Sequence, residues 1–359
     1  MSTADWQQPA GGIPPGGPGA SRRGIWVKLT IVLLILAILA WVILLAADYL
    51  KTGQPITDLG PLPKPVADLL YKPSFRYVTS VEGVQSPLGV AIGKDGRVYV
   101  TESGGERKVH IFNSLGQEVG AFAPPATEVP DPVPVYAAVS PTTGDVYVSD
   151  RGAAAIFTFS ADGAFQGAVT PPAGFEDWHP LGLTFDEAGN LYVADVTPEK
   201  HRVIVLDPRG QLKLSFGSQG EEDGQFWYPN GVAVDSQGRI FVADSNNGRM
   251  QAFDMDGQFL FKISRGMSPG DLSMPRGIAV DSEGRLLIAD TSRGAVQAYE
   301  ISKSAGSDPQ SAPVKFLGSF SGSGASGSFL QFPNGLALDG HGNIYVADRV
   351  NNRVQVWKY

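Results

Sequence analysis

Acidic side chains recur along this sequence at regular intervals and are the first candidates for chemistry. A ring of carboxylates around one point could hold a cation such as calcium, which prefers oxygen ligands. A binding site needs its ligands in one place, however, and these groups are spread over the chain, one in each copy of a repeat. We therefore expect them to accept hydrogen bonds from turn amides and, in four copies, to pair with an arginine. The carboxylates are Glu102, Asp150, Asp195, Asp244, Asp290 and Asp348, and the pairs are Glu102–Arg107, Asp195–Arg202, Asp244–Arg249 and Asp348–Arg353.

Histidines are few, and cysteine is absent. Without cysteine the chain has no disulfide, thiol nucleophile or zinc–thiolate site. A zinc site would need about three histidines at one place. Only His179 precedes the first strand of a repeat, where side chains approach the axis, whereas His110, His201 and His341 fall at other positions. No serine or threonine has the context of a catalytic nucleophile. We predict no catalytic residue, no metal ligand and no cofactor, with a divalent cation as the alternative.

Six similar segments contain these carboxylates. In each, two apolar, β-branched stretches flank a Gly-containing turn, and a third and a fourth strand follow. Thirteen positions separate the carboxylate from the opening glycine, with Ala137 taken as its equivalent in the second copy. Four antiparallel strands per unit, repeated radially, predict a β-propeller. The segments read PLGVAIGKDGRVYVTE, VYAAVSPTTGDVYVSD, PLGLTFDEAGNLYVAD, PNGVAVDSQGRIFVAD, PRGIAVDSEGRLLIAD and PNGLALDGHGNIYVAD.

The two ends of the repeat region complement each other. The last copy stops at Tyr359 after its third strand, and the segment FRYVTSVEG (Phe75–Gly83) precedes the first copy. Pairing these ends would close the ring and remove an exposed sheet edge. The predicted fold is therefore all-β, a propeller of six four-stranded blades closed by the N-terminal strand.

The motifs Pro-x-Gly-[VIL]-Ala-[VL]-Asp, [VIL]-[YF]-Val-Ala-Asp and Asn-x-Arg-Val-Gln-Val-[FW] resemble the NHL-repeat family over Phe75–Tyr359. The second copy departs most, because it has neither the Pro-x-Gly nor the arginine. The resemblance implies a six-bladed propeller used mainly for macromolecular recognition. The family also includes extracytoplasmic sensor domains of bacterial receptor kinases and an amidating lyase. The scattered histidines argue against the zinc chemistry of such a lyase.

The residues just before the opening glycine differ from copy to copy, so the scaffold does not dictate them. Loops on a rigid scaffold carry binding residues, and aromatic residues beside Asn and Arg are typical of interaction hot spots. The alternative is that the aromatic residues seal the gaps between blades, as expected for Phe226. This ring comprises Leu88, Tyr136, Leu181, Asn230, Arg276 and Asn334, and nearby loops add Trp178, His179, Trp227, Tyr228 and Phe332. The predicted partner contacts are Tyr136, Trp178, His179, Trp227, Tyr228, Asn230, Arg276 and Asn334.

A membrane anchor is predicted ahead of the repeats. Leu29–Ala47 is nineteen residues without a charge, or about 28 Å of helix, close to the hydrocarbon thickness of a bilayer. The run is long for a cleaved signal peptide. Arg22, Arg23 and Lys28 precede it, so the N-terminus is expected in the cytoplasm and the repeats outside the plasma membrane. The predicted organisation is a Gly/Pro-rich tail (1–24), a single transmembrane helix (25–48), a Pro-rich spacer (49–73) and the propeller (74–359).

Composition narrows the functional classes. The formal net charge of −8 argues against a nucleic-acid partner, which needs a basic footprint. The absence of cysteine and of glycosylation sequons favours a bacterial or archaeal source. The favoured function is a non-catalytic binding module for an envelope protein, peptide or glycan. The alternatives are a lyase or lactonase-like hydrolase with a divalent cation held by Asn230, Asn334 and Asp244, and an architectural spacer. The insertion Ser302–Pro313 is expected on the opposite face, without chemistry.

Overall fold

The computed structural model describes Leu36 and residues 75–302, 313–321 and 329–359. The chain divides between Lys72 and Pro73 into two units. The predicted tail, transmembrane helix and spacer lie outside the described residues, apart from Leu36, which is helical. Within the described residues, no helix has the length and hydropathy needed to cross a membrane.

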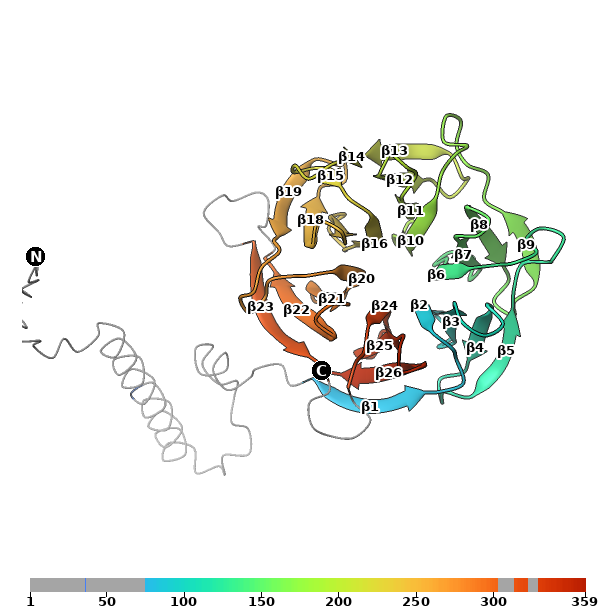
Figure 1. Cartoon of the computed structure of the whole chain (residues 1–359), viewed down its shortest axis with the longest axis horizontal. Coiled ribbons are helices and arrows are strands. Elements are labelled where there is room, and N and C mark those ends of the chain that lie inside the picture. The colour runs from blue at the N-terminus through green and yellow to red at the C-terminus, as the bar shows by residue number, and fades with distance from the viewer. Residues whose placement is uncertain (1–35, 37–74, 303–312, 322–328) are drawn as a thin grey trace, which may run out of the picture. The chain divides into compact units, whose positions relative to one another are not determined.

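The second unit is the predicted six-bladed β-propeller (Figure 1). Each blade is a four-stranded antiparallel sheet in which apolar residues pack against the neighbouring blades. The first blade is β2 (Pro87–Ile92), β3 (Val98–Glu102), β4 (Val109–Phe112) and β5 (Glu118–Phe122). The second is β6 (Pro134–Val139), β7 (Val146–Asp150), β8 (Ala155–Phe159) and β9 (Phe165–Ala168). The third is β10 (Pro180–Phe185), β11 (Leu191–Asp195), β12 (Arg202–Leu206) and β13 (Leu212–Phe216).

The remaining blades follow the same plan. The fourth is β16 (Pro229–Val234), β17 (Ile240–Asp244), β18 (Arg249–Phe253) and β19 (Phe259–Ile263). The fifth is β20 (Pro275–Val280), β21 (Arg285–Asp290), β22 (Ala295–Ile301) and β23 (Val314–Phe320). The sixth is β24 (Pro333–Leu338), β25 (Asn343–Asp348), β26 (Arg353–Lys358) and β1 (Arg76–Val81). A short parallel pair, β14 (Ser218–Gln219) and β15 (Gln225–Phe226), lies in the connection between the third and fourth blades.

The ring closes as the sequence predicts. Strand β1 is the outer strand of the sixth blade and runs antiparallel to β26, with Arg76 opposite Lys358 and Val81 opposite Val354 (Figure 1). Phe75 extends this contact, because its ring lies 4.7 Å from that of Phe320 and 4.9 Å from that of Tyr359. The pairing covers the edge that β26 would otherwise expose.

The innermost strands β2, β6, β10, β16, β20 and β24 surround the axis (Figure 1). Their backbones approach closely, which explains the glycine of the repeated motif. A Cβ atom added at Gly89 would lie 2.7 Å from the carbonyl oxygen of Val135, and one at Gly277 would lie 2.9 Å from the Cα of Gly335. Because any side chain would collide with the next blade there, glycine is required at these positions for steric reasons.

The second blade corrects one feature of the predicted repeat. Six residues separate Val139 from its partner Val146, whereas five separate Val234 from Ile240. The first hairpin of this blade is thus one residue longer, and counting back from the carboxylate shifts its alignment by one. Pro134 opposite Asp150 corresponds to Pro229 opposite Asp244. Tyr136, opposite Ser149, therefore stands where Gly231, opposite Ala243, stands in the fourth blade.

Strand register also defines two faces. Each carboxylate ends the second strand of its blade, beside the first residue of the first strand and the loop into the third strand. We call this end of the propeller the carboxylate face, and the connections from blade to blade reach it. The opposite face carries the other turns, and the insertion Ser302–Pro313 begins and ends there, since Ile301 pairs with Val314. Residues 303–312 of that insertion lie outside the described part.

Candidate functional site

All six repeated carboxylates are buried, with at most 3% of their surface exposed. Each accepts a backbone N–H from the loop that enters its own blade. The donor–acceptor distances are 2.8 Å for Gln85 to Glu102, 2.9 Å for Val133 to Asp150, 2.7 Å for His179 to Asp195, 2.7 Å for Trp227 to Asp244, 2.8 Å for Ser273 to Asp290 and 2.7 Å for Gln331 to Asp348. The carboxylates therefore hold the entry loops in place instead of forming one ring around a cation.

Three of the four expected arginine pairs form. The Nε atoms of Arg202, Arg249 and Arg353 donate to the carboxylates of Asp195, Asp244 and Asp348 at 2.8, 2.8 and 3.0 Å. The Glu102–Arg107 pair does not form. Arg107 reaches the exposed Asp131 at 2.7 Å.

His110 takes the place of that arginine in the first blade. Its Nε2 atom lies 3.1 Å from Glu102, and its Nδ1 atom lies 2.8 Å from Glu118. The repeat-based prediction failed here because a histidine on the neighbouring strand β4 already occupies the carboxylate.

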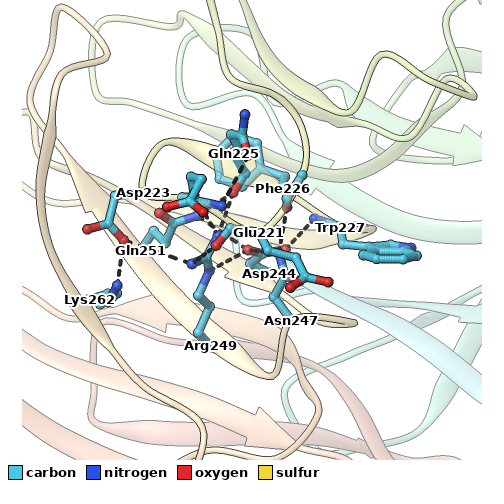
Figure 2. A network of polar contacts seen from close by, with 12 residues as sticks. Glu221, Asp223, Gln225, Phe226, Trp227, Asp244, Asn247, Arg249, Gln251 and Lys262 are labelled. Carbon is cyan, nitrogen blue, oxygen red and sulfur yellow. Dashed lines mark hydrogen bonds and ion pairs between the residues drawn. The ribbon is translucent and has the colours of Figure 1, made fainter.

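The loop between the third and fourth blades is held most extensively (Figure 2). Arg249 donates to Asp244 and to the backbone oxygens of Glu221, Glu222 and Gln225 at 2.6–2.9 Å. Asn247 adds bonds to Gly220 and Asp244, and Gln251 bonds to Gln225. The sixth blade repeats the pattern, since Asn351, Arg353 and Gln355 all donate to the backbone oxygen of Phe329. This network fixes the loop that ends in Trp227 and Tyr228.

Trp227 and Tyr228 are presented to solvent by that fixed loop, with 44% and 37% of their surfaces exposed. Tyr228 has a φ of 64°, a left-handed conformation that is uncommon for a non-glycine residue. Its N–H donates to Nδ1 of the buried His201 at 3.2 Å, and its carbonyl accepts from the N–H of Ser245. Burial lowers the pKa of His201. The neutral imidazole therefore stabilises an unusual backbone position.

A cavity of about 430 Å³ lies beside these aromatic residues on the carboxylate face. Leu181, Val196 and Pro198 form an apolar wall of the cavity, and His179, Glu199 and His201 add polar groups to it. Trp227 and Tyr228 complete the lining, so the structure brings together three of the predicted contact residues, His179, Trp227 and Tyr228. We call this cavity the aromatic pocket. Phe332 is also exposed, at 50%.

Trp178 is not available to a partner. Only 2% of its surface is exposed, and it packs with Ile156, Leu191 and Leu206 between the second and third blades. Phe226, which is fully buried, fills the equivalent gap between the third and fourth blades as expected. The sequence left two interpretations open for these aromatic residues. Trp178 fills a gap between blades, whereas Trp227 and Tyr228 are exposed to solvent.

Tyr136 lies across the propeller axis and is also buried, contrary to the prediction that it belongs to the exposed ring. Val135 stands in the ring in its place. The Tyr136 ring packs with Leu88, Val135 and Leu181. Its hydroxyl lies 3.2 Å from Oδ1 of Asn230 and 3.0 Å from Oδ1 of Asn334. Burial raises the pKa of this phenol, which keeps it protonated as a donor.

The same contacts bear on the predicted cation ligands. Asn230 and Asn334 are 8% and 2% exposed, and both side chains meet the phenol of Tyr136. Asp244 is fully buried and bonded to Trp227 and Arg249. These three residues do not converge as open ligands. Among the described residues, no group of three or more histidine or acidic side chains is arranged to hold a metal ion.

A second cavity, of about 290 Å³, opens beside the tyrosine on the carboxylate face. Arg151, Arg276 and Arg349 line it together with Asn230 and Asn334. We call it the cationic cavity. It shares Arg151, Leu181 and Tyr228 with the aromatic pocket, so the two cavities adjoin. Arg276 was predicted as a contact, whereas Arg151 and Arg349 were missed. Both missed residues directly follow a repeated carboxylate, which was the available signal.

Comparisons with known proteins agree with this architecture. The NHL repeat family matches residues 226–253, 272–299 and 330–357, within the last three blades. No curated protein matches the sequence.

Among solved structures, a gluconolactonase from Xanthomonas campestris has a TM-score of 0.57 at 16% identity and covers 78% of this chain and 88% of its own. Virginiamycin B lyase from Staphylococcus aureus has a TM-score of 0.53 at 14% identity, covering 80% and 99%. A chain of the nidogen–laminin complex has a TM-score of 0.53 at 17% identity, covering 66% and 80%. At such identities the likeness shows the fold alone. This chain is a six-bladed β-propeller that contains NHL repeats.

Proposed function

We propose that this protein is a non-catalytic binding module that recognises an envelope protein, a peptide or a glycan through the carboxylate face of its propeller. The observation that carries the proposal is the pairing of exposed Trp227 and Tyr228 with the adjoining aromatic pocket. The Arg249 network holds their loop, so these side chains are pre-ordered for contact (Figure 2). Binding to a pre-ordered surface avoids much of the entropy cost of association.

The contacts of Tyr136 support binding over catalysis at the centre of the ring. Its hydroxyl lies within hydrogen-bond distance of the amide oxygens of Asn230 and Asn334. A divalent cation held by those amides and Asp244 would require the buried Asp244 to give up its bonds to Trp227 and Arg249. We therefore do not favour the metal-dependent lyase or lactonase alternative.

The binding test compares two apolar truncations on opposite faces. Trp227→Ala removes the exposed anchor, whereas Leu115→Ala removes an 80% exposed residue from a turn between β4 and β5 on the opposite face. For the partner that co-purifies with the full-length chain, Trp227→Ala should weaken binding by about 2 kcal/mol or more, roughly thirtyfold. Leu115→Ala should leave binding unchanged. Equal affinities for both variants would contradict the proposed site.

The membrane anchor belongs to the same proposal. Leu29–Ala47 is the proposed single-pass helix, with the propeller on the extracytoplasmic side of the plasma membrane, because Arg22, Arg23 and Lys28 precede the helix. Protease added to intact cells or spheroplasts should remove a tag placed after Tyr359. If the tag is protected until the cells are lysed, the proposed topology is wrong.

A further inference from the structure

The cationic cavity concentrates positive charge in an acidic protein. The chain has a formal net charge of −8, yet four arginines, Arg107, Arg151, Arg276 and Arg349, line one cavity of about 290 Å³, and none of the described residues lining it is acidic. Arg107 pairs with Asp131, which leaves the other three arginines. The three arginines come from the second, fifth and sixth blades. Folding thus brings together like charges that are far apart in the sequence.

These guanidinium groups lack the partners that other arginines of this chain have. Arg202, Arg249 and Arg353 each pair with a buried aspartate. Within the described part of the chain, Arg151, Arg276 and Arg349 form no ion pair and no side-chain hydrogen bond. The Nε atom of Arg276 is buried without a hydrogen-bond partner. A buried donor left unsatisfied costs about 1–3 kcal/mol, and more when the group is charged.

Electrostatics point the same way as this geometry. Burial, together with the charges of Arg276 and Arg151, lowers the pKa of Arg349. Besides burial, the like charges of Arg276 and Arg151 therefore disfavour the charged form of Arg349. An oxyanion placed among them would relieve this repulsion and would accept the free N–H groups, and Arg suits this because its fork of donors matches carboxylate and phosphate oxygens.

We propose that the cationic cavity binds the oxyanion group, a carboxylate or a phosphate, of the ligand whose apolar part occupies the adjoining aromatic pocket. Arg276 and Arg349 bind the anion, and Arg151, which lines both cavities, lies at the junction. The amides of Asn230 and Asn334, held by Tyr136, form the neutral wall. This inference rests on the proposed binding function and adds the chemical class of the ligand.

The test measures the melting temperature of the full-length chain in sodium phosphate, sodium acetate and sodium chloride at matched ionic strength. Phosphate stabilises proteins in general by exclusion from their surfaces, so the comparison is between variants. The test variant is Arg276→Gln/Arg349→Gln, and the matched control is Arg209→Gln. Arg209 lies in the turn between β12 and β13 on the opposite face.

Beyond the general effect of the salt, phosphate or acetate should raise the melting temperature of the wild type and of Arg209→Gln in a saturable way. The double variant should lack this additional rise. A rise with acetate as well as phosphate identifies a carboxylate site, and a rise with phosphate alone identifies a phosphate site. Equal shifts in all three proteins would overturn the proposal. If the double variant does not fold, Arg349→Gln alone should show a smaller shift than Arg209→Gln, and equal shifts would again overturn it.

Failure of this inference can be told apart from failure of the proposed function. Trp227 lines the aromatic pocket but not the cationic cavity. Trp227→Ala should therefore lose the partner and keep the phosphate-dependent or acetate-dependent rise. If Trp227→Ala loses the partner while no protein shows the rise, the binding module stands without an anion site.

Discussion

The hydroxyl of Tyr136 lies 3.0 Å from Oδ1 of Asn334, which joins the second blade to the sixth across the propeller axis. The same hydroxyl lies 3.2 Å from Oδ1 of Asn230 in the fourth blade. A phenol has one proton, so it can donate to only one amide oxygen at a time. Three blades thus share one buried polar contact at the centre of the ring, and two of its members, Asn230 and Asn334, line the cationic cavity.

We expect Tyr136→Phe to lower the free energy of unfolding by about 1–3 kcal/mol, because two buried amides lose their shared partner without any loss of ring packing. Tyr147→Phe is the matched control, since the Tyr147 hydroxyl forms no hydrogen bond with the described residues. Urea denaturation measures the free energy of unfolding of both variants. A loss as small as that of Tyr147→Phe would show that the axial contact contributes no stability.

The repeats predicted the blades and their closure, but not this tyrosine. A missing fourth strand at Tyr359 and a spare strand at Phe75–Gly83 determine the ring closure, because an unpaired edge is costly. Tyr136 was misplaced because an extra residue in the hairpin between Val139 and Val146 shifts any alignment made from the carboxylate. Aligning Pro134 with the other opening prolines would have placed Tyr136 at the glycine position.

Side-chain placement at the site was predictable only where the repeat enforces it. The arginine that follows a repeated carboxylate pairs with it in three of the four expected cases, yet in the first blade His110 replaces it. Trp178 and Trp227 occupy similar places in the sequence, but one is 2% exposed and the other 44%. Exposure there depends on how neighbouring blades pack, which no local pattern specifies.

Arg249 should contribute far more to the free energy of unfolding than Arg107, the arginine at the equivalent position of the first blade. Arg249 and Arg107 each lie five positions after a repeated carboxylate. The Arg249 side chain is 9% exposed, and its removal would leave the fully buried Asp244 without its charged partner. Arg249→Ala should therefore lower the free energy of unfolding by about 3–5 kcal/mol. Arg107 and Asp131 are 39% and 82% exposed, so Arg107→Ala should cost about 0–1 kcal/mol. Equal losses in denaturant unfolding would show that the network does not hold the loop.

The loop that carries Tyr228 should loosen in mild acid. Burial lowers the pKa of His201, while its contact with the backbone carbonyl of Phe226 and the smaller effects of Asp195 and Asp244 oppose this. A lowered pKa in the folded state means that the stabilisation is complete above the ordinary value of 6.5 and decreases as the pH falls below it. Protonation of Nδ1 also removes the acceptor for the Tyr228 N–H.

Hydrogen exchange at the Tyr228 amide measures this loosening directly. Its protection should decrease below pH 6.5 in the wild type, after correction for the intrinsic pH dependence of exchange. His201→Gln should abolish that pH-dependent decrease, because glutamine does not titrate. The same decrease in both proteins would exclude His201 as its cause.

Site-specific photocrosslinking in the native cells tests the central claim, that the carboxylate face is the binding surface. A photoreactive amino acid replaces Trp227 in one protein and Leu115 in another, and both positions are exposed but on opposite faces. We expect one discrete adduct from position 227, which is lost when unmodified wild-type protein is present in excess, and none from position 115. A discrete adduct from position 115 with none from position 227 would contradict the account.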